Sequence, residues 1–325
     1  LINLSSQAEV DAFQEVHGPC DQVSFELNVG GIDITDLQPL APLAGVDGFF
    51  TISGAPDLAS LQGLEALSSV QVLQLIVLHG LSDLSGLSSL VDVSNMLVIS
   101  DSDGMTSLSG LPANLTELHT LTLQFNDGLT SLTGFPTVQN GMSTFALVGN
   151  GSLANLNGMP ATIASLETLS IIANASLSSL DGLSAIASLE RDLDVSSNPM
   201  LTSLAGLANT TFSAQDPANP RQSIIIGGNS ALTTLEGIPS ATQLDDFEIT
   251  DNTSLTDCSW LQKVFDDVDD GPPGPGPTNP GDPPDIANIS DVFISGNGQG
   301  CNSIEEILQA PPDSLVFENG FESGG

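Results

Sequence analysis

Apolar and polar positions recur along most of the chain in one pattern of about 24 residues. Each copy follows Φ-x-Φ-x-x-N-x-x-Φ-x-x-Φ-x-G-Φ, where Φ is apolar, and the clearest copy is LDVSSNPMLTSLAGL at Leu193–Leu207. A fixed period of this length is typical of a solenoid in which each copy forms one coil. Eight further copies stand at Phe50–Leu64, Leu73–Leu87, Leu97–Leu111, Leu121–Phe135, Phe145–Met159, Leu169–Leu183, Ile224–Ile238 and Phe247–Leu261.

Within one copy, the spacing of the apolar positions indicates a strand followed by turns. The opening Φ-x-Φ pair turns alternate side chains inward, and stacked coils pair these short strands into a parallel sheet. The later apolar positions are three residues apart, which indicates irregular or 3₁₀-like turns. The glycine near the end of most copies permits a tight backbone corner. Since no coil buries its leucines alone, the coils must stack on one another.

An asparagine stands just after the strand in six copies. Successive members are 24 residues apart three times, and then 31 and 23 apart, with the seven extra residues at Gln215–Arg221. An asparagine at this place can bond backbone groups of its own and neighbouring coils, which satisfies polar groups in the interior. The sequence therefore predicts a structural ladder made of Asn126, Asn150, Asn174, Asn198, Asn229 and Asn252.

Both ends of the repeat carry helix-start signals. The SQAE sequence that begins at Ser6 is a capping-box pattern, and it predicts a short amphipathic helix through Val10, Phe13 and Val16. The SIEE sequence that begins at Ser303 repeats the signal. The predicted organisation is an N-terminal capping helix in 1–19, the solenoid in 20–262, an acidic Pro/Gly-rich excursion in 263–287, a last strand and capping helix in 288–310, and an apolar tail in 311–325.

Several segments together resemble a known family. They are CDQVSFELNV at Cys20–Val29, ITDLQPLAPL at Ile34–Leu43, the N-x-x-L-T-S-L-x-G-L coils, and ISGNGQGCNSIEEIL at Ile294–Leu308. The chain from roughly Cys20 to Ala310 looks like the leucine-rich β-solenoids of the receptor L-domain type, particularly their bacterial secreted relatives. We therefore expect a mainly β fold, a right-handed leucine-rich β-solenoid of about ten 23–24-residue coils with short helical caps at both ends.

The three cysteines are too few for a disulfide framework and lack metal-type spacing. Cys258 and Cys301 flank the excursion, and we expect a disulfide between them. Cys20 then remains as a thiol that is free or pairs between molecules. Because no basic and apolar leader precedes the first polar stretch, we expect that any signal peptide was removed or not included. These features fit an extracellular protein, secreted or on the cell surface, and the resemblance implies a bacterial source.

The charge balance restricts the partners. Only 3 Lys and Arg oppose 40 Asp and Glu, which gives a formal net charge of −37 at pH 7. Nucleic acid is not expected as a partner because phosphate binding needs clustered basic side chains. Insertion into a membrane is not expected either, since the apolar run at Leu73–Leu78 is far shorter than the roughly 20 residues that span a bilayer.

Acidic clusters raise the question of a metal. Asp266, Asp267, Asp269 and Asp270 place four carboxylates within five residues, and hard oxygen ligands suit Ca²⁺. The alternative is a hydrated acidic loop, because the spacing is not that of an EF-hand. The DSDG sequence that begins at Asp101 is a weaker candidate of the same kind. We expect no required cofactor, with Ca²⁺ as the one candidate ion.

Motifs for catalysis are absent from the sequence. His17, His79 and His119 are the only histidines, and no two are close in sequence. Paired carboxylates act as catalysts only when they face each other across a cleft with separated pKa values. We therefore expect a non-enzymatic protein and keep an acidic hydrolase as a remote alternative. Ice binding is equally remote, because the Ser/Thr pairs lie between leucines outside the predicted strands.

A regular rod with an apolar tail favours contacts between proteins. We expect a self-assembling surface or filament subunit or an adhesin, whose partner is a second copy or another cell-surface protein. The alternative is a receptor-like ectodomain that recognises a glycan or a protein on its sheet face. Against this, the middle outward strand positions carry small or acidic residues without Trp or Tyr. The residues expected to mediate assembly are Cys20, Leu315, Val316, Phe317 and Phe321.

Overall fold

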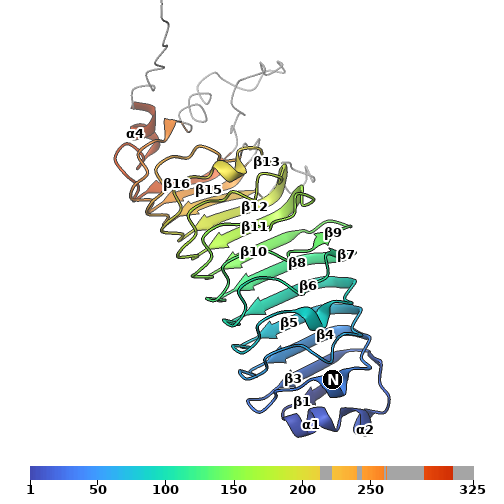
Figure 1. Cartoon of the computed structure of the whole chain (residues 1–325). Coiled ribbons are helices and arrows are strands. Elements are labelled where there is room, and N and C mark those ends of the chain that lie inside the picture. The colour runs from blue at the N-terminus through green and yellow to red at the C-terminus, as the bar shows by residue number, and fades with distance from the viewer. Residues whose placement is uncertain (213–221, 240–243, 260, 262–288, 310–325) are drawn as a thin grey trace, which may run out of the picture.

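Each copy of the repeat places one strand directly beside the strand of the next copy. The pairings are parallel, and Leu121 lies opposite Leu97 on one side and Phe145 on the other. The computed structural model is thus a parallel β-solenoid of about ten coils, as predicted, and Figure 1 shows the coils stacked along a rod. The structure describes residues 1–212, 222–239, 244–259, 261 and 289–309.

One large parallel sheet runs the length of the rod in the order β1-β3-β4-β5-β6-β8-β10-β11-β12-β14-β15-β16, with β2 beside β4 and β13 beside β12. A small second sheet pairs β7 with β9. The strands are β1 (Ile2–Leu4), β2 (Gln22–Val23), β3 (Glu26–Gly30), β4 (Gly45–Ser53), β5 (Ser69–Ile76), β6 (Asp92–Ser100), β7 (Asn114–Leu115), β8 (Glu117–Gln124), β9 (Thr137–Val138), β10 (Thr144–Val148), β11 (Ser165–Ile172), β12 (Ser188–Ser196), β13 (Thr211–Phe212), β14 (Ser223–Gly227), β15 (Leu244–Thr250) and β16 (Ile289–Ser295). The α-helices are α1 (Gln7–Asp11), α2 (Phe13–His17) and α4 (Ile304–Gln309), and the 3₁₀ turns are η1 (Gln38–Leu40), η2 (Ser85–Leu87) and η3 (Ala205–Leu207).

The apolar columns of the repeat form one continuous core. On β4, Phe50 and Ile52 are fully buried, and the next apolar positions, Leu58, Leu61 and Leu64, are buried as well. The three-residue spacing therefore carries leucines around the coil into the same interior. Among the described residues, three coils use a true 3₁₀ turn for this and the other coils use irregular turns, which confirms the sequence expectation in part.

A sharp backbone corner ends the strand in every regular coil. The residue at this corner has a positive φ in the left-handed region, although only four of the ten are glycine. The amide of the corner residue donates to the strand-end carbonyl of the next coil, as Val77 does to Ser100 over 2.9 Å. The corner residues are Gly54, Val77, Asp101, Phe125, Gly149, Ala173, Ser197, Gly228, Asp251 and Gly296.

In the six coils predicted to carry the ladder, the asparagine follows this corner directly and is fully buried. The Asn174 side chain shows the pattern: its Nδ2 donates to the Leu147 carbonyl at 2.9 Å and to Asn198 Oδ1 at 3.2 Å. Its Oδ1 accepts the Asn150 backbone amide at 3.0 Å. Asn297 continues the ladder beyond the six predicted members, because its Oδ1 accepts the Asn252 amide at 3.0 Å.

A second column of glycines allows adjacent coils to approach closely. At Gly182, φ is +111°, and a Cβ there would lie 2.6 Å from the Leu156 carbonyl oxygen of the preceding coil. Gly86 lies in η2 with an ordinary φ, yet a Cβ there would overlap the Leu61 carbonyl oxygen. Glycine is therefore required in this column because the neighbouring backbone leaves no room for a Cβ. In some coils the positive φ is a second reason for glycine.

Short helices lie at both ends of the rod (Figure 1). Ser6 caps α1 through a bond from the Glu9 amide at 3.3 Å, as the SQAE pattern predicts. The Glu9 carboxylate, however, accepts the amide of Ser5 at 2.6 Å, one residue before the cap. The same shift occurs before α4, where Glu306 accepts the Asn302 amide at 3.1 Å.

Two features of the N-terminal end differ from the sequence expectations. The helix breaks at Ala12, so α2 does not continue the face of α1, and Val16 is 69% exposed whereas Val10 and Phe13 are buried. In addition, β1 precedes the helices and pairs with β3, so the first coil begins before the cap. Three residues at the very start of a chain carry too little pattern to predict such a strand.

Candidate functional site

The outward face of the large sheet carries rows of side chains that run along the rod. The first outer row is formed by the residue before the first inward apolar position, and the middle outer row by the residue after it. The first outer row contains Glu26, Phe49, Val72, Met96, Thr120, Thr144, Thr168, Asp192, Ser223 and Asp246. The middle outer row contains Asn3, Asn28, Thr51, Gln74, Val98, Thr122, Ala146, Ser170, Asp194, Ile225, Glu248 and Phe293.

The chemistry of these two rows changes along the rod. The N-terminal coils carry amides and Thr51 in the middle row. Their first row starts with Glu26 and continues with apolar side chains, where Phe49 is 48% exposed beside Val72 and Met96. The central coils carry mainly hydroxyl groups, and the C-terminal coils carry acids together with Ile225 and with Phe293, which is 59% exposed. Sequence reasoning missed Phe49 and Met96 because it considered only the middle outward position of each strand. The residue before each first apolar position was the signal that could have found them.

Polar side chains of the N-terminal coils are held in fixed orientations. Asn28 Nδ2 donates to Asn3 Oδ1 at 3.0 Å and to Glu26 Oε1 at 3.1 Å, and Thr51 Oγ1 donates to Gln74 Oε1 at 3.0 Å. A shallow depression of about 390 Å³ lies at this end of the sheet. It is lined by Asn3, Leu4, Ser5, Asn28, Gly30, Thr51 and Ser53.

The acidic end of the face contains a carboxyl with a perturbed pKa. Burial raises the pKa of Asp194, the hydrogen bond from Ser196 lowers it, and the nearby Glu248 carboxylate raises it further. Ser196 Oγ donates to Asp194 Oδ1 at 2.5 Å, which compensates for only part of the lost hydration. The ionised form of Asp194 is therefore less favourable in the folded state than in the unfolded chain.

We predict that Asp194→Asn makes the protein more stable than the wild type at pH 7. Because the folded-state pKa is raised, the wild type loses stability as pH rises from the unfolded carboxyl pKa of about 3.9 through the raised value. The asparagine variant does not lose this contribution, so the stabilities of the two proteins should become similar near pH 3, where Asp194 is protonated in both the folded and the unfolded state. Urea unfolding midpoints at both pH values measure this, with Asp57→Asn, at an exposed loop acid, as the control. Equal midpoints of wild type and Asp194→Asn at pH 7 would contradict the prediction.

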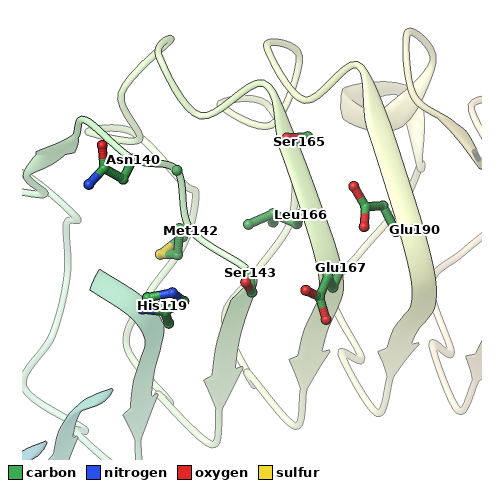
Figure 2. Close-up of a pocket in the computed structure, with 9 residues that line it drawn as sticks. His119, Asn140, Met142, Ser143, Ser165, Leu166, Glu167 and Glu190 are labelled. Atoms are coloured by element: carbon green, nitrogen blue, oxygen red, sulfur yellow. The ribbon is translucent and has the colours of Figure 1, made fainter. Parts of the chain in front are cut away.

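A second depression, of about 200 Å³, lies where β8, β10, β11 and β12 begin. Figure 2 shows Glu167 and Glu190 on neighbouring strands, with Ser143 and His119 on the preceding coils. Burial, and next the Glu167 carboxylate, raise the pKa of Glu190. The lining residues are His119, Asn140, Gly141, Met142, Ser143, Ser165, Leu166, Glu167 and Glu190.

Ser143, His119 and the carboxylates do not form a hydrolytic triad in this arrangement. The Ser143 amide donates to the His119 carbonyl at 2.8 Å, so the two residues are neighbours. Within the described part of the chain, however, neither side chain makes a hydrogen bond, whereas a nucleophile and its base need direct contact. No group of three or more His, Cys, Asp or Glu suited to a metal ion occurs among the described residues.

Several residues singled out from the sequence lie outside the described residues. These are the proposed Ca²⁺ ligands Asp266, Asp267, Asp269 and Asp270 and the tail residues Leu315, Val316, Phe317 and Phe321. The weaker DSDG candidate is visible, and its carboxylates bond to the protein itself. Asp101 accepts the Ser100 hydroxyl at 2.5 Å, and Asp103 accepts the Asp127 amide at 2.9 Å while lying 3.5 Å from His79 Nδ1.

The cysteines have distinct environments. Cys258 and Cys301 form a disulfide that links the last regular coil to the segment before α4, across 43 residues of chain. Both are buried. Cys20 is a half-buried free thiol near the N-terminal cap, where its Sγ contacts the Gln22 carbonyl at 3.0 Å.

The fold places the chain in the class of parallel β-solenoids. No family model, curated protein or solved structure matches it. Among the described residues, no helix has the length and apolar character needed to cross a membrane.

Proposed function

We propose that this chain is a non-enzymatic extracellular structural or interaction protein of the leucine-rich receptor L-domain type, and that it associates with itself through its N-terminal end. The observation that carries the proposal is where apolar side chains are exposed. Five of the ten exposed large apolar residues in the described part of the chain lie within residues 1–49. They are Leu1 (71%), Val16 (69%), Phe25 (74%), Ile32 (81%) and Phe49 (48%).

Two of these residues, Leu1 and Ile32, lie near the terminal strand of the large sheet. β1 is the terminal strand of the large sheet, so the outer side of its backbone has no strand partner among the described residues. Ile32 lies close to this edge, because its neighbour Gly31 packs against the Ser5 carbonyl. Apolar surface beside an open strand edge favours contact with another protein surface. Cys20 lies at the same end and would be available to such an interface.

Sedimentation velocity of the full chain over a range of concentrations tests self-association. We expect larger species as concentration rises, and more of them at high salt, because screening weakens repulsion between molecules of net charge −37. Replacing the two most exposed of these residues together, Phe25→Ser and Ile32→Ser, should weaken association about tenfold or more.

Met200→Ser is the matched control, because Met200 is 56% exposed but lies far along the rod. It should leave association unchanged. A chain that sediments as a monomer at every concentration and salt level would contradict the proposal. Deleting Pro311–Gly325 in the same assay tests whether the apolar tail contributes, as the sequence suggests.

A further inference from the structure

The N-terminal end of the middle outer row is an array of neutral hydrogen-bonding groups with fixed positions. The internal bonds use both Nδ2 hydrogens of Asn28, so its Oδ1 remains as an acceptor. The Thr51 bond to Oε1 likewise leaves the Gln74 Nε2 as a donor. The groups left free are therefore two neighbouring acceptors, Asn28 Oδ1 and Thr51 Oγ1, followed by the Gln74 donor. Together with β1 the row covers four adjacent strands, which at about 4.8 Å per strand extend over roughly 14 Å.

An apolar row runs beside this polar row on the same face. Phe49 and Thr51 are two residues apart on β4, so both side chains point outward. The row continues from Phe49 into Val72, which is 3% exposed, and the half-buried Met96. The Phe49 ring thus lies at the end of an apolar row whose other members, Val72 and Met96, are less exposed.

The polar row ends beside Gly30, where only a glycine fits against the neighbouring strand. Gly30 belongs to the lining of the 390 Å³ depression, and a Cβ there would lie 2.9 Å from the Ser53 carbonyl oxygen. The depression is therefore bounded by backbone at Gly30 and by the other lining residues around it. A ligand that lies across the strands has room to enter at the β1 edge.

Charge selects the class of ligand. Nothing cationic lines the depression, and the net charge of −37 repels anionic ligands. The Glu26 carboxylate beside the row already accepts a bond from Asn28, whereas Asp194 and Glu248 place two carboxylates near each other, so a cationic ligand is drawn more strongly to the acidic coils. A neutral sugar chain has hydroxyl groups that both donate and accept, and C–H faces that pack on an aromatic ring, so it matches both rows.

We propose that the outward face of the first coils binds a neutral oligosaccharide, with Asn3, Asn28, Thr51 and Gln74 bonding its hydroxyl groups and Phe49 packing against a sugar ring. This function goes beyond self-association and uses a different assay. The sheet supplies both rows already oriented, so little conformational entropy is lost on binding.

The test is binding of the labelled full chain to an array of neutral oligosaccharides of glucose, mannose, xylose and N-acetylglucosamine, followed by titration calorimetry with the best member. We expect saturable binding to at least one of them. Phe49→Ala and Gln74→Ala should each weaken binding about tenfold, which corresponds to about 1.4 kcal/mol. Both side chains point away from the core, so unchanged unfolding midpoints will show that the variants fold.

Thr168→Val is the matched control, because Thr168 occupies the first outer row several coils away. It should bind like the wild type. Absence of binding to every neutral sugar, binding confined to anionic sugars, or binding that survives both variants would overturn the proposal. If an apolar peptide binds instead and only Phe49→Ala weakens it, the face is a peptide site. Phe49 belongs to both surfaces, so self-association is decided separately by sedimentation velocity of the Phe25→Ser and Ile32→Ser variant, whose changes lie outside the proposed sugar site.

Discussion

Replacing Asn174 with alanine is expected to lower the free energy of unfolding by on the order of 3–5 kcal/mol. The variant removes the side-chain partner of the Asn150 amide and of the Leu147 carbonyl inside a fully buried core, whereas Asn198 Oδ1 keeps the bond from the backbone amide of residue 174. Each buried polar group that loses its hydrogen bond costs about 1–3 kcal/mol. The alanine also leaves a small void.

Chemical denaturation measures the total loss, and amide hydrogen exchange shows where it occurs. Solenoid coils interact mainly with their neighbours, so exchange should increase most in the coils on either side of Asn174. Asn209→Ala is the control: this asparagine is exposed and makes one long bond, of 3.5 Å, to the Ser184 carbonyl. We expect it to change stability by no more than about 0.5 kcal/mol. If Asn174→Ala were equally mild, the ladder would not be a stabilising element.

Gly182→Ala is expected to destabilise the protein about as much as Asn174→Ala, with a loss of about 3 kcal/mol or more in the free energy of unfolding. Two causes add at this position. An L residue at φ +111° is strained, and the new Cβ would press on the Leu156 carbonyl at 2.6 Å, so the coils would have to separate. Thermal and chemical unfolding of the variant measure the sum.

Substitutions of two further glycines measure backbone strain and the contact between coils separately. Gly141 has φ +84°, and no atom lies within 4 Å of the place that a Cβ would occupy, so Gly141→Ala reports backbone strain alone, of about 1–2 kcal/mol. Gly86 has an ordinary φ but no room for a Cβ beside the Leu61 carbonyl, so Gly86→Ala reports the coil contact alone. Should Gly86→Ala be tolerated, close approach of the coils would not be the reason for the glycine column.

The repeat could be predicted from the sequence because each apolar column has a simple physical consequence. Φ-x-Φ turns two side chains inward, the asparagine has one place where its amide can be satisfied, and Leu97, Leu121 and Phe145 stack as the 24-residue period requires. The coil geometry is thus encoded many times over, and the parallel solenoid is confirmed without any related protein.

Features that depend on one residue in one coil could not be predicted from the sequence. The left-handed corner accepts Val77, Phe125 and Asp251 as well as glycine, so no residue type marks it. The outward rows vary freely because they do not determine the fold, and the N-terminal depression arises from a combination of Asn3, Asn28 and Gly30 on strands of different length. Such sites require the register of the strands, which composition and period do not supply.

The strand pairing of the large sheet also determines how the rod would respond to tension. A pull along the rod axis loads the interfaces between coils in series, so every interface bears the same force and the one with the fewest bonds yields first. The β1–β3 interface pairs three residues, whereas β5–β6 pairs seven. Adding coils would therefore lengthen the rod without making it stronger, and mechanical failure would begin at its N-terminal end.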